Sequence, residues 1–482
     1  MTPSPAIVWF RKDLRIADNP ALCAAIARGG PVIGLYILEE GRFLSPRGAQ
    51  RWFLHHALDA LSGRLASIGI PLVFRRGEAG RELSALIRES GGGAVFWNRR
   101  YAAEEIAEDK AVKASLAAAG VETQSFNGAL LREPWEVKSK TGGPYRVYTP
   151  FWNALRAMGP GREPLSAPVK KCPPSPRPSS LALADLGLLP QKPNWAREFP
   201  GQWTPSELGA EAALGAFLAK AAKSYAEDRN RPDRAGTSRL SPHLAVGTIS
   251  PVAVWRRMAA AIEAGAVPEG EGWKFLSEIA WREFASHLLY FHPDMATAPL
   301  RPEFADFPWR EDAAALEAWK RGMTGVPIVD AGMRELWRTG WMHNRVRMIA
   351  ASFLVKNLLV HWREGERWFW DTLVDADAGN NAASWQWVAG SGADAAPYFR
   401  IFNPVTQGEK FDPDGAYVRR YVPELAGLPA ETIHQPWTAS EQALKRAKVE
   451  LGRTYPAPIV DLGETRRRAL AAYDAMRQGA AS

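Results

Sequence analysis

The chain has 482 residues, of which 46% are hydrophobic, 23% charged and 10% aromatic. This balance is typical of a folded, soluble protein of about two to four domains, and it argues against general disorder. No apolar run reaches the ~18 residues of a membrane helix, and the N-terminus lacks the pattern of a secretory signal, so we expect neither. Two cysteines, Cys23 and Cys172, are too few for a disulfide framework or a cysteine-rich metal site. A reducing compartment is the simplest interpretation.

The net charge and the tryptophan content are unusual. Sixty Lys and Arg residues against 52 Asp and Glu residues give a formal charge of +8. This excess suits an anionic partner such as nucleic acid, but it also fits a protein that is merely basic. Most of the 20 tryptophans follow residue 250. Their rings can fill a core, or they can stack on bases or on a flat cofactor.

Short apolar runs alternate with amphipathic stretches in the first 130 residues. The predicted strands span residues 6–10, 32–38, 71–74, 94–97 and 121–126. Helical spacing lies between them, for example at 52–69 and 103–120. This alternation predicts a parallel sheet with helices on both faces. No G-x-G-x-x-G follows a strand, so dinucleotide binding of the usual Rossmann kind is not supported.

The middle of the chain is rich in proline. Eleven prolines lie between Pro160 and Pro205, which predicts an extended connector. From about residue 206 onward the spacing is helical, as at 206–229 and 346–374, without a convincing strand pattern. The predicted fold is therefore α/β plus all-α: an α/β domain over 1–130, a linker over 131–205 and a helical domain over 206–482.

Two short motifs carry polar groups that suit a ligand. The run 236–241 (GTSRLS) places hydroxyls before a predicted helix start, where phosphate binds readily. Plain helix capping by Ser241 is the more frequent use of such residues. Glu278, Trp281 and Arg282 share one face of a predicted helix. That face fits either a planar polar ligand or a surface ion pair beside a core tryptophan.

Two later motifs are richer in polar groups. Asn344, Arg347 and Met348 share a helical face that is too polar for ordinary core and too apolar for ordinary surface. Residues 375–387 hold two acids, two adjacent asparagines and two tryptophans, a density that needs partners if it is buried. A D-x-D metal site is one alternative, but no later Glu stands at calcium-loop spacing. Without a zinc, G-x-S-x-G or P-loop motif, hydrolase and NTPase functions lack their usual sequence support.

Together these motifs resemble those of the DNA photolyase and cryptochrome family. The matching runs are 9–15 (WFRKDLR), 236–241 (GTSRLS), 278–284 (EIAWREF), 341–348 (WMHNRVRM), 375–387 (DADAGNNAASWQW), 396–404 (APYFRIFNP) and 406–411 (TQGEKF). They follow one another along nearly the whole chain. The resemblance implies an N-terminal Rossmann-like domain, a long linker and a C-terminal helical domain that holds FAD in a cavity. Such a cavity would explain why the glycine fingerprint is missing.

The resemblance also implies the cofactor site. Arg347 and Asp375 should pair beside the flavin ring, as functional positioning rather than as a source of stability. Asn381 should face flavin N5, where an amide resembles photolyases and an Asp resembles plant cryptochromes. The residues implied to bind FAD are Tyr225, Thr237, Ser238, Arg239, Leu240, Ser241, Glu278, Trp281, Arg282, Asn344, Arg347, Asp375, Asp377 and Asn381.

Within the family, the sequence is most similar to bacterial cyclobutane pyrimidine dimer photolyases of a branch close to plant cryptochromes. The implied activity is that of a carbon–carbon lyase: reduced FAD passes an electron, under blue light, to a dimer flipped out of DNA. Asn344 and Met348 stand where photolyases of the (6-4) type carry His. The residues implied to bind the lesion and its strand are Arg229, Glu278, Trp281, Asn344, Arg345, Met348, Trp387 and Gln407. The alternative is a cryptochrome-type photoreceptor.

Further expectations follow from the resemblance. Glu278 should stabilise the dimer radical, and Trp385, Trp362 and Trp309 should photoreduce the flavin. We expect a methenyltetrahydrofolate antenna, with 8-hydroxy-deazaflavin as the alternative, near the run 97–101 and Glu104–Glu105. The expected partner is UV-damaged DNA and not a membrane. The expected state is a monomer in the bacterial cytosol or nucleoid.

Overall fold

The computed structural model describes residues 3–42, 44–394 and 399–479. The chain folds as two units, each assembled from separate segments. The first unit comprises residues 1–223, 238–293 and 374–379, and the second comprises residues 224–237, 294–373 and 380–482. Each unit therefore takes in chain from both sides of residue 230, and the predicted domain boundaries at 130 and 205 stay predictions.

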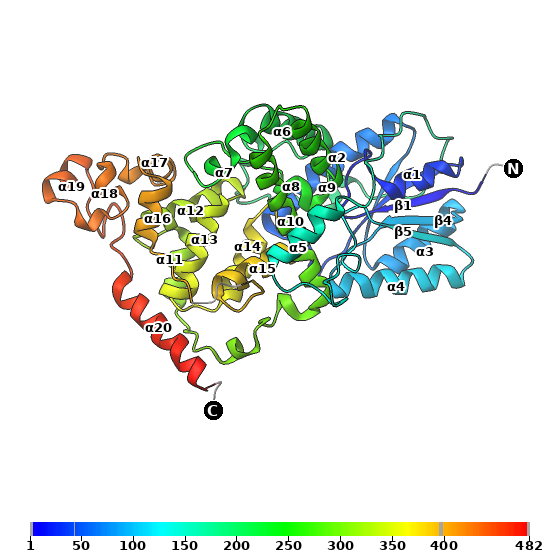
Figure 1. Cartoon of the computed structure of the whole chain (residues 1–482). Coiled ribbons are helices and arrows are strands. Elements are labelled where there is room, and N and C mark those ends of the chain that lie inside the picture. Colours follow the sequence, from blue (N-terminus) through cyan, green and yellow to red (C-terminus); the bar gives the residue numbers. More distant parts are fainter. Residues whose placement is uncertain (1–2, 43, 395–398, 480–482) are drawn as a thin grey trace. The chain divides into compact units, whose positions relative to one another are not determined.

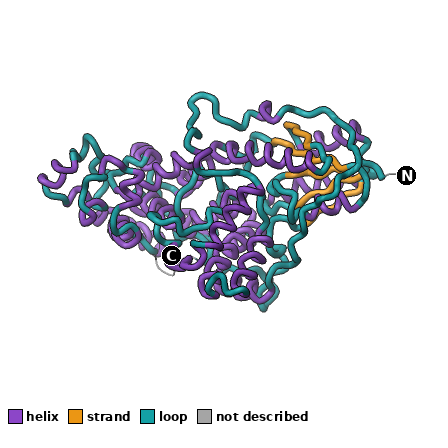
Figure 2. The backbone as a smooth tube through the Cα atoms, turned by 90° about the horizontal axis from the view of Figure 1, so that it is seen from above, coloured by secondary structure: helices purple, strands orange, loops and turns teal. Residues whose placement is uncertain are grey.

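A five-stranded parallel sheet in the order β3-β2-β1-β4-β5 organises the first unit (Figures 1 and 2). The strands are β1 (Ala6–Phe10), β2 (Val32–Leu38), β3 (Leu72–Arg76), β4 (Ala94–Asn98) and β5 (Glu122–Phe126). All five predicted strands are confirmed, with ends displaced by two residues at most. The direction in which the chain builds the sheet reverses between β1 and β4, which is where ligands bind in folds of this type.

Helices cover both faces of this sheet, as the alternation of elements predicts. They are α1 (Pro20–Ala27), α2 (Gly48–Ser67), α3 (Ala79–Ser90) and α4 (Ala103–Ala118). Trp9 and Trp97 lie in one core with Leu86 of α3 and Leu116 of α4. On the opposite face a Cβ at Gly34 would lie 3.2 Å from a methyl group of Leu65 in α2. Burial on both faces explains why the strands are continuous apolar runs rather than alternating ones.

The rest of the first unit is helix and connector. Its other helices are α5 (Tyr148–Met158), η1 (Leu183–Leu186), η2 (Phe199–Gly201), α6 (Glu207–Ala219), η3 (Ala221–Ser224), α8 (Ser241–Val246), α9 (Pro251–Glu263) and α10 (Glu269–Phe291). The proline-rich segment 160–205, which is described throughout, holds only the two short 3-10 turns η1 and η2. The segment belongs wholly to the first unit, and the interdomain linker predicted over 131–205 stays a prediction.

One buried side chain ties distant parts of the first unit together. Arg15 follows β1 and is 2% exposed. Its guanidinium donates to the backbone oxygens of Asp18, Gly128 and Gly247, at 2.8, 2.6 and 2.9 Å. Three carbonyl dipoles thus compensate for the loss of solvent around a buried charge.

The second unit is helical. Its helices are α7 (Tyr225–Asp228), η4 (Pro293–Ala296), η5 (Pro302–Asp306), α11 (Ala313–Arg321), α12 (Pro327–Thr339), α13 (Asn344–Ser352), η6 (Phe353–Asn357), α14 (Trp362–Thr372), α15 (Ala378–Ala389), α16 (Pro404–Phe411), α17 (Ala416–Tyr421), η7 (Pro423–Leu425), α18 (Ala430–Ile433), η8 (Pro436–Thr438), α19 (Glu441–Ala447) and α20 (Leu462–Gly479). The first residues of α15 belong to the first unit. None of the described helices is long and apolar enough to cross a membrane.

The segment 346–374, which has helical spacing throughout, is divided between several helices in the structure. Helix α13 continues into η6, which is a π-helical turn, and the helix then stops before α14 begins at Trp362. Leu359 has a left-handed φ of 55°, which an α-helix cannot accommodate. His361 then accepts a hydrogen bond from the amide of Arg363 at 3.1 Å and caps the new helix.

Candidate active site

The hydroxyl-rich run before α8 has a strained backbone. Arg239 has a φ of 52°, and its guanidinium lies 4.4 Å from the ring centre of Trp203. Ser238 Oγ accepts a hydrogen bond from the amide of Leu240 at 3.4 Å. Ser241 is the first residue of α8 and is exposed, while Leu240 occupies the capping position without a side-chain bond. Helix capping by Ser241, the simpler interpretation of this motif, is therefore wrong.

The neighbouring residues of this run belong to the second unit. A Cβ at Gly236 would lie 2.5 Å from the backbone oxygen of Asp228, so only glycine allows this approach to α7. Thr237 follows directly and is half-buried. The Arg229 guanidinium lies 5.7 Å from the ring centre of Tyr225, which is buried. The structure thus brings Tyr225, Arg229 and Thr237 to one short segment.

Helix α10 carries the predicted ligand face. Trp281 stacks on Tyr148 with ring centres 3.6 Å apart and planes 8° from parallel. Glu278 lies one turn away, and its Oε1 is 3.1 Å from Nζ of Lys274. Both Glu278 and Trp281 are half-buried. The helical spacing therefore predicted their common face correctly, and the stack on Tyr148 fixes the plane of the indole.

Arg282 is held by the connector after β5. Its Nη1 donates to the backbone oxygen of Ala129 at 2.9 Å and lies 3.2 Å from Oε1 of Glu283. Glu283 also accepts a hydrogen bond from the amide of Leu131 at 2.7 Å. Burial raises the pKa of Glu283 to about 7, against the effect of Arg282. These contacts assign Arg282 a structural position, and its predicted contact with a cofactor stays a prediction.

His343 precedes α13 and is surrounded by positive charge. It is 3% exposed, and its Nδ1 accepts a hydrogen bond from the amide of Arg345 at 3.2 Å. Burial, together with the charges of Arg345, Arg347 and Arg229, lowers the pKa of His343 to about 3, while Asp233 acts in the opposite direction. The imidazole is therefore neutral. We call Arg229, Arg345 and Arg347 the arginine cluster.

The first turn of α13 presents groups of several kinds. Arg345 donates to Oδ1 of Asn230 at 2.6 Å, and its guanidinium lies 4.5 Å from the ring centre of Phe411. Asn344 is exposed, and Met348 is half-buried one turn further along the same face. Gln407 lies four residues before Phe411 in α16, on the same side of that helix. Arg345 therefore contacts Phe411 at the end of α16, the helix that also carries Gln407.

Asp375 and Asp377, which precede α15, lie in the first unit, whereas Asn381 of α15 lies in the second. Asp375 is buried in the first unit, where Nε2 of Gln50 donates to the oxygen of Ala376 at 2.6 Å. Asp377 is half-buried. In the second unit, Nδ2 of Asn381 donates to the backbone oxygen and to Oε1 of Glu366, at 3.1 and 2.7 Å. Two bonds through its nitrogen fix the Asn381 amide, so its oxygen is the group that it can offer to a ligand.

The tryptophans of the second unit are closely packed. A Cβ at Gly365 would lie 2.1 Å from the Trp385 ring, so glycine in α14 lets this indole lie against the helix. His361 lies between Trp362 and Trp309, with ring centres 5.7 and 5.1 Å away. Trp385 and Trp362 are 2% exposed, whereas Trp309 and Trp387 are half-buried. Their predicted roles stay predictions.

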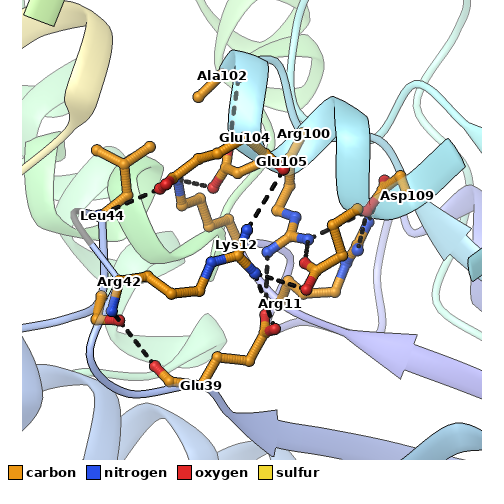
Figure 3. Close-up of polar contacts among 12 residues, drawn as sticks. Arg11, Lys12, Glu39, Arg42, Leu44, Arg100, Ala102, Glu104, Glu105 and Asp109 are labelled. Carbon is orange, nitrogen blue, oxygen red and sulfur yellow. Dashed lines mark hydrogen bonds and ion pairs between the residues drawn. The ribbon is translucent and has the colours of Figure 1, made fainter. Parts of the chain in front are cut away.

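A network of charged side chains lies at the carboxyl edge of the sheet in the first unit (Figure 3). Side chains that follow β1, β2 and β4 meet the first turns of α4. Arg11 and Arg100 bond Asp109 at 2.8 and 3.1 Å, and Lys12 bonds Glu105 at 2.7 Å. We call the following set the edge network: Arg11, Lys12, Glu39, Arg42, Arg100, Glu105, Glu108 and Asp109.

The edge network holds its carboxyl groups in different states. Burial would raise the pKa of Glu105, but Lys12 and Arg100 outweigh it and lower the value to about 2. Burial raises the pKa of Glu39 to about 7, and a hydrogen bond with Glu108 adds to the effect. A proton is thus retained between Glu39 and Glu108 in weakly acidic solution.

The run 97–101, predicted to lie near the antenna, bonds to groups of its own unit. Nε1 of Trp97 donates to Asp109 at 3.0 Å, and Nε of Arg99 donates to Glu133 at 3.0 Å. Arg100 belongs to the edge network. Oε1 of Glu104 accepts a weak hydrogen bond from the amide of Leu44 at 3.3 Å (Figure 3). Among the described residues, no group of three or more His, Cys, Asp or Glu side chains could hold a metal ion.

Sequence reasoning missed several residues that organise the second unit. In the sequence, Glu366 lies among other charged residues and resembles an ordinary surface residue. In the structure it is buried and accepts a hydrogen bond from Asn381. His343 belongs to no motif singled out in the sequence, although it caps α13. The one available signal was the position of His343 immediately before a helical run.

Comparison with known families matches both parts of the chain. The family described as DNA photolyase matches residues 6–173, and the family described as FAD binding domain of DNA photolyase matches residues 275–475. Deoxyribodipyrimidine photo-lyase of Agrobacterium fabrum is 53% identical over 98% of each chain. The enzyme of that name from Escherichia coli is 40% identical over 98% of this chain and 99% of its own. Cryptochrome-1 of Arabidopsis thaliana is 39% identical over 98% of this chain and 70% of its own length.

Solved structures give the same result. A bacterial class III photolyase from Agrobacterium tumefaciens superposes with a TM-score of 0.96 at 53% identity, over 99% of this chain and 98% of its own. A cryptochrome from Synechocystis sp. PCC6803 superposes with a TM-score of 0.89 at 28% identity, over 98% and 99%. The expected Rossmann-like and helical architecture is therefore confirmed, and the chain belongs to the DNA photolyase family.

Proposed function

We propose that this chain is a photolyase that uses FAD and blue light to split cyclobutane pyrimidine dimers in DNA. The observation that carries the proposal is the 53% identity, over 98% of both chains, to a deoxyribodipyrimidine photo-lyase. The similarity to a class III photolyase structure over the whole chain supports it. The residues that the structure describes fit FAD, because hydroxyl, carboxyl and amide groups stand at the matching motif positions.

The fixed amide of Asn381 supports a role beside the flavin. Bound FAD, when fully reduced and excited by light, supplies the electron for dimer splitting. Asn381 offers its oxygen to an N–H donor of the ring, because Glu366 holds its nitrogen. An amide supplies no carboxyl proton, which favours repair over proton-coupled signalling. Tyr225, Thr237, Ser238 and Ser241 are proposed to bind the phosphates and sugar, as are Arg239 and Leu240 through their backbone.

The remaining flavin contacts are proposed on the same basis. Arg347 of the second unit and Asp375 and Asp377 of the first unit are each proposed to bind the cofactor. Asn344 and Arg282 complete the set. Trp385, Trp362 and Trp309 return the flavin to its reduced state by relaying an electron from the surface. His361 between the last two supports a continuous aromatic path for that relay.

The lesion contacts are proposed residue by residue. In the first unit, Glu278 hydrogen-bonds the dimer and stabilises its radical, and the fixed plane of Trp281 supports stacking on it. In the second unit, Trp387 stacks on the dimer and Met348 contacts it. Asn344 and Met348 contain no titratable group, which suits a splitting reaction that needs no proton transfer. Flipping the dimer out costs least where damage has weakened pairing.

The strand contacts follow the charge of the second unit. Arg229 and Arg345 belong to the arginine cluster and are proposed to bind phosphates beside the lesion. Gln407 is proposed to bind the same strand, because it stands in α16, whose last residue, Phe411, lies against Arg345. Phosphate contacts of this kind make affinity depend on salt.

Three finer assignments complete the proposal. The antenna is methenyltetrahydrofolate, with 8-hydroxy-deazaflavin as the alternative, and the partner is UV-damaged DNA. An archaeal photolyase from Sulfolobus tokodaii carries two FAD molecules, one implicated in light harvesting, so antennae vary among similar folds. We propose a monomer that works in the bacterial cytosol.

The decisive experiment measures dimer loss from a UV-damaged thymine oligonucleotide with the flavin fully reduced. Repair is expected under blue light and not in the dark. Glu278→Ala should lower the repaired fraction per absorbed photon, while Glu271→Ala, in the first turn of the same helix, should not. Light exposure without dimer loss, in a protein that holds FAD, would reject the proposal. The 39% identity to Cryptochrome-1 makes a photoreceptor the second candidate in that event.

A further inference from the structure

A buried carboxylate lies behind the helix that carries the proposed lesion contacts. Glu335, in α12, is 5% exposed. Its Oε2 accepts hydrogen bonds from the amide of His343 at 3.1 Å and from the Tyr417 hydroxyl at 2.7 Å. Its Oε1 accepts a bond from the Tyr421 hydroxyl at 3.2 Å. The two tyrosines stand on α17, so one carboxylate joins α12, α17 and the turn before α13.

Burial of the Glu335 carboxylate is an unfavourable way to stabilise the packing of α12 on α17. Burying a carboxylate removes its water, and the hydrogen bonds that it gains return only part of that energy. Apolar side chains of similar size would pack α12 on α17 at least as well. The donors are well suited to an anion, because burial raises the pKa of Tyr417 well above its ordinary value and keeps its hydroxyl protonated. A carboxylate in this place therefore points to a requirement for exact positioning.

The bond to His343 is the one that reaches the site. Two other contacts of the turn are local: Thr339 Oγ1 accepts from the amide of Trp341 at 3.2 Å, and Nε of Arg347 donates to the oxygen of Met342 at 2.7 Å. Glu335 instead fixes the last residue before α13 to a different helix. Asn344 and Arg345 follow that residue directly, so a shift of His343 moves both.

A second contact places the same turn relative to α16. Arg345 lies over Phe411, the last residue of α16, and α17 begins five residues later. The first turn of α13 is thus held through Glu335 to α17 and through Arg345 to α16. Substrate stacking and phosphate binding depend on such placement, because displacement of a binding group by about 1 Å can cost up to a hundredfold.

We propose that Glu335 is a positioning residue for lesion recognition, which fixes the turn before α13 to α17 and thereby sets the places of Asn344, Arg345 and Met348. This inference rests on the proposed function, because it assigns these three residues to the damaged strand. Glu335 itself touches neither DNA nor flavin. Its removal should therefore impair discrimination of damaged DNA and leave flavin chemistry intact.

The test compares Glu335→Gln with wild type as FAD-loaded protein in the dark, where no photochemistry is needed. Affinity for a duplex with one thymine dimer should fall about tenfold, the worth of one charge-assisted hydrogen bond. Affinity for the undamaged duplex should stay within about twofold, because charge alone supplies it. FAD content and the rate of flavin photoreduction should not change. Glu424→Gln is the matched control, because Glu424 pairs with the neighbouring Arg334 of α12 at 2.7 Å.

Tyr417→Phe provides a second test that retains the carboxylate. It should lower dimer affinity by a smaller factor, and the double variant should be no worse than Glu335→Gln, because both act through one contact. Unchanged discrimination in both variants would overturn the proposal. Equal losses for damaged and undamaged DNA, or loss of FAD, would also overturn it, since they would show a general structural role. Failure of wild type to repair dimers in light would count against the proposed function and leave the dark binding test valid.

Discussion

Two groups of arginines in this protein have opposite surroundings. In the edge network of the first unit, four basic and four acidic side chains bond to one another at the end of the sheet. In the second unit, the arginine cluster gathers around a neutral histidine, and Asp233 is the carboxylate that opposes it most strongly there. Paired charges of opposite sign hold elements of a structure together, whereas an excess of positive charge favours the binding of an anion. An arginine in the sequence therefore does not show whether it has a structural or a binding role until its partners are known.

The largest effect should come from unbalancing the edge network. Arg100→Ala leaves Glu108 and Asp109, whose side chains are 11% and 12% exposed, without one of their cations. We expect the free energy of unfolding to fall by about 3–5 kcal/mol, the usual result of breaking a buried pair. A urea titration measures this, with the exposed Arg81→Ala as control. A loss below about 1 kcal/mol would contradict the idea that this network is structural.

Trp387→Ala separates stacking from charge in the second unit. Affinity for dimer-containing DNA should fall by about 1–3 kcal/mol, the range for loss of one base-stacking ring. The dependence of affinity on salt should not change, since no charge is removed. Trp337→Ala is the control, because Trp337 is 52% exposed and lies in α12. A changed salt slope for Trp387→Ala would show that stacking and charge are not separable here.

Arg345→Ala tests the electrostatic contribution of one arginine to DNA affinity. The slope of log affinity against log salt concentration should become shallower by about 1, the contribution of one phosphate contact. Binding of undamaged DNA should weaken in parallel. Arg453→Ala, which removes an exposed charge paired with Glu450, should leave the slope unchanged. An identical slope for both variants would remove Arg345 from the proposed DNA contacts.

The smallest effect concerns the proton between Glu39 and Glu108. The pKa of Glu39 is raised to about 7 by burial, so the folded state holds a proton that the unfolded state releases near its ordinary value. Folding is then favoured below the ordinary pKa of Glu39, and this part of the stability is lost as pH rises towards 7. Glu39→Gln should remove ~1 kcal/mol of that dependence, after allowance for partial exposure. Urea midpoints at pH 5 and 7.5 measure it, and parallel curves for both proteins would contradict it.

The sequence predicted the features that depend on local spacing. The five strands follow from short apolar runs, and the common face of Glu278 and Trp281 follows from the 3.6-residue period of a helix. The periodic apolar pattern also continued through η6, which hid the end of α13. The capping position of His361 was the signal that could have corrected this.

Contacts between distant residues could not be predicted in this way. Glu366 meets Asn381 across a helix break, and Glu335 meets Tyr417 across 82 residues. In the edge network, Lys12 meets Glu105 across 93 residues. Each of these acids occupies an ordinary helical or loop position, so only the packed structure distinguishes it from a solvated charge.

The carbonyl contacts of Arg15 set an order of events during synthesis. Gly247, one of its three acceptors, lies 121 residues beyond the end of β5. At about 5–20 residues per second, a ribosome takes roughly 6–24 s to add that stretch after the last strand is complete. During that interval the nascent sheet carries a guanidinium whose final acceptor has not yet been made. Chaperones that bind exposed nascent segments therefore have a defined window on this chain, which closes when the loop after α8 leaves the exit tunnel.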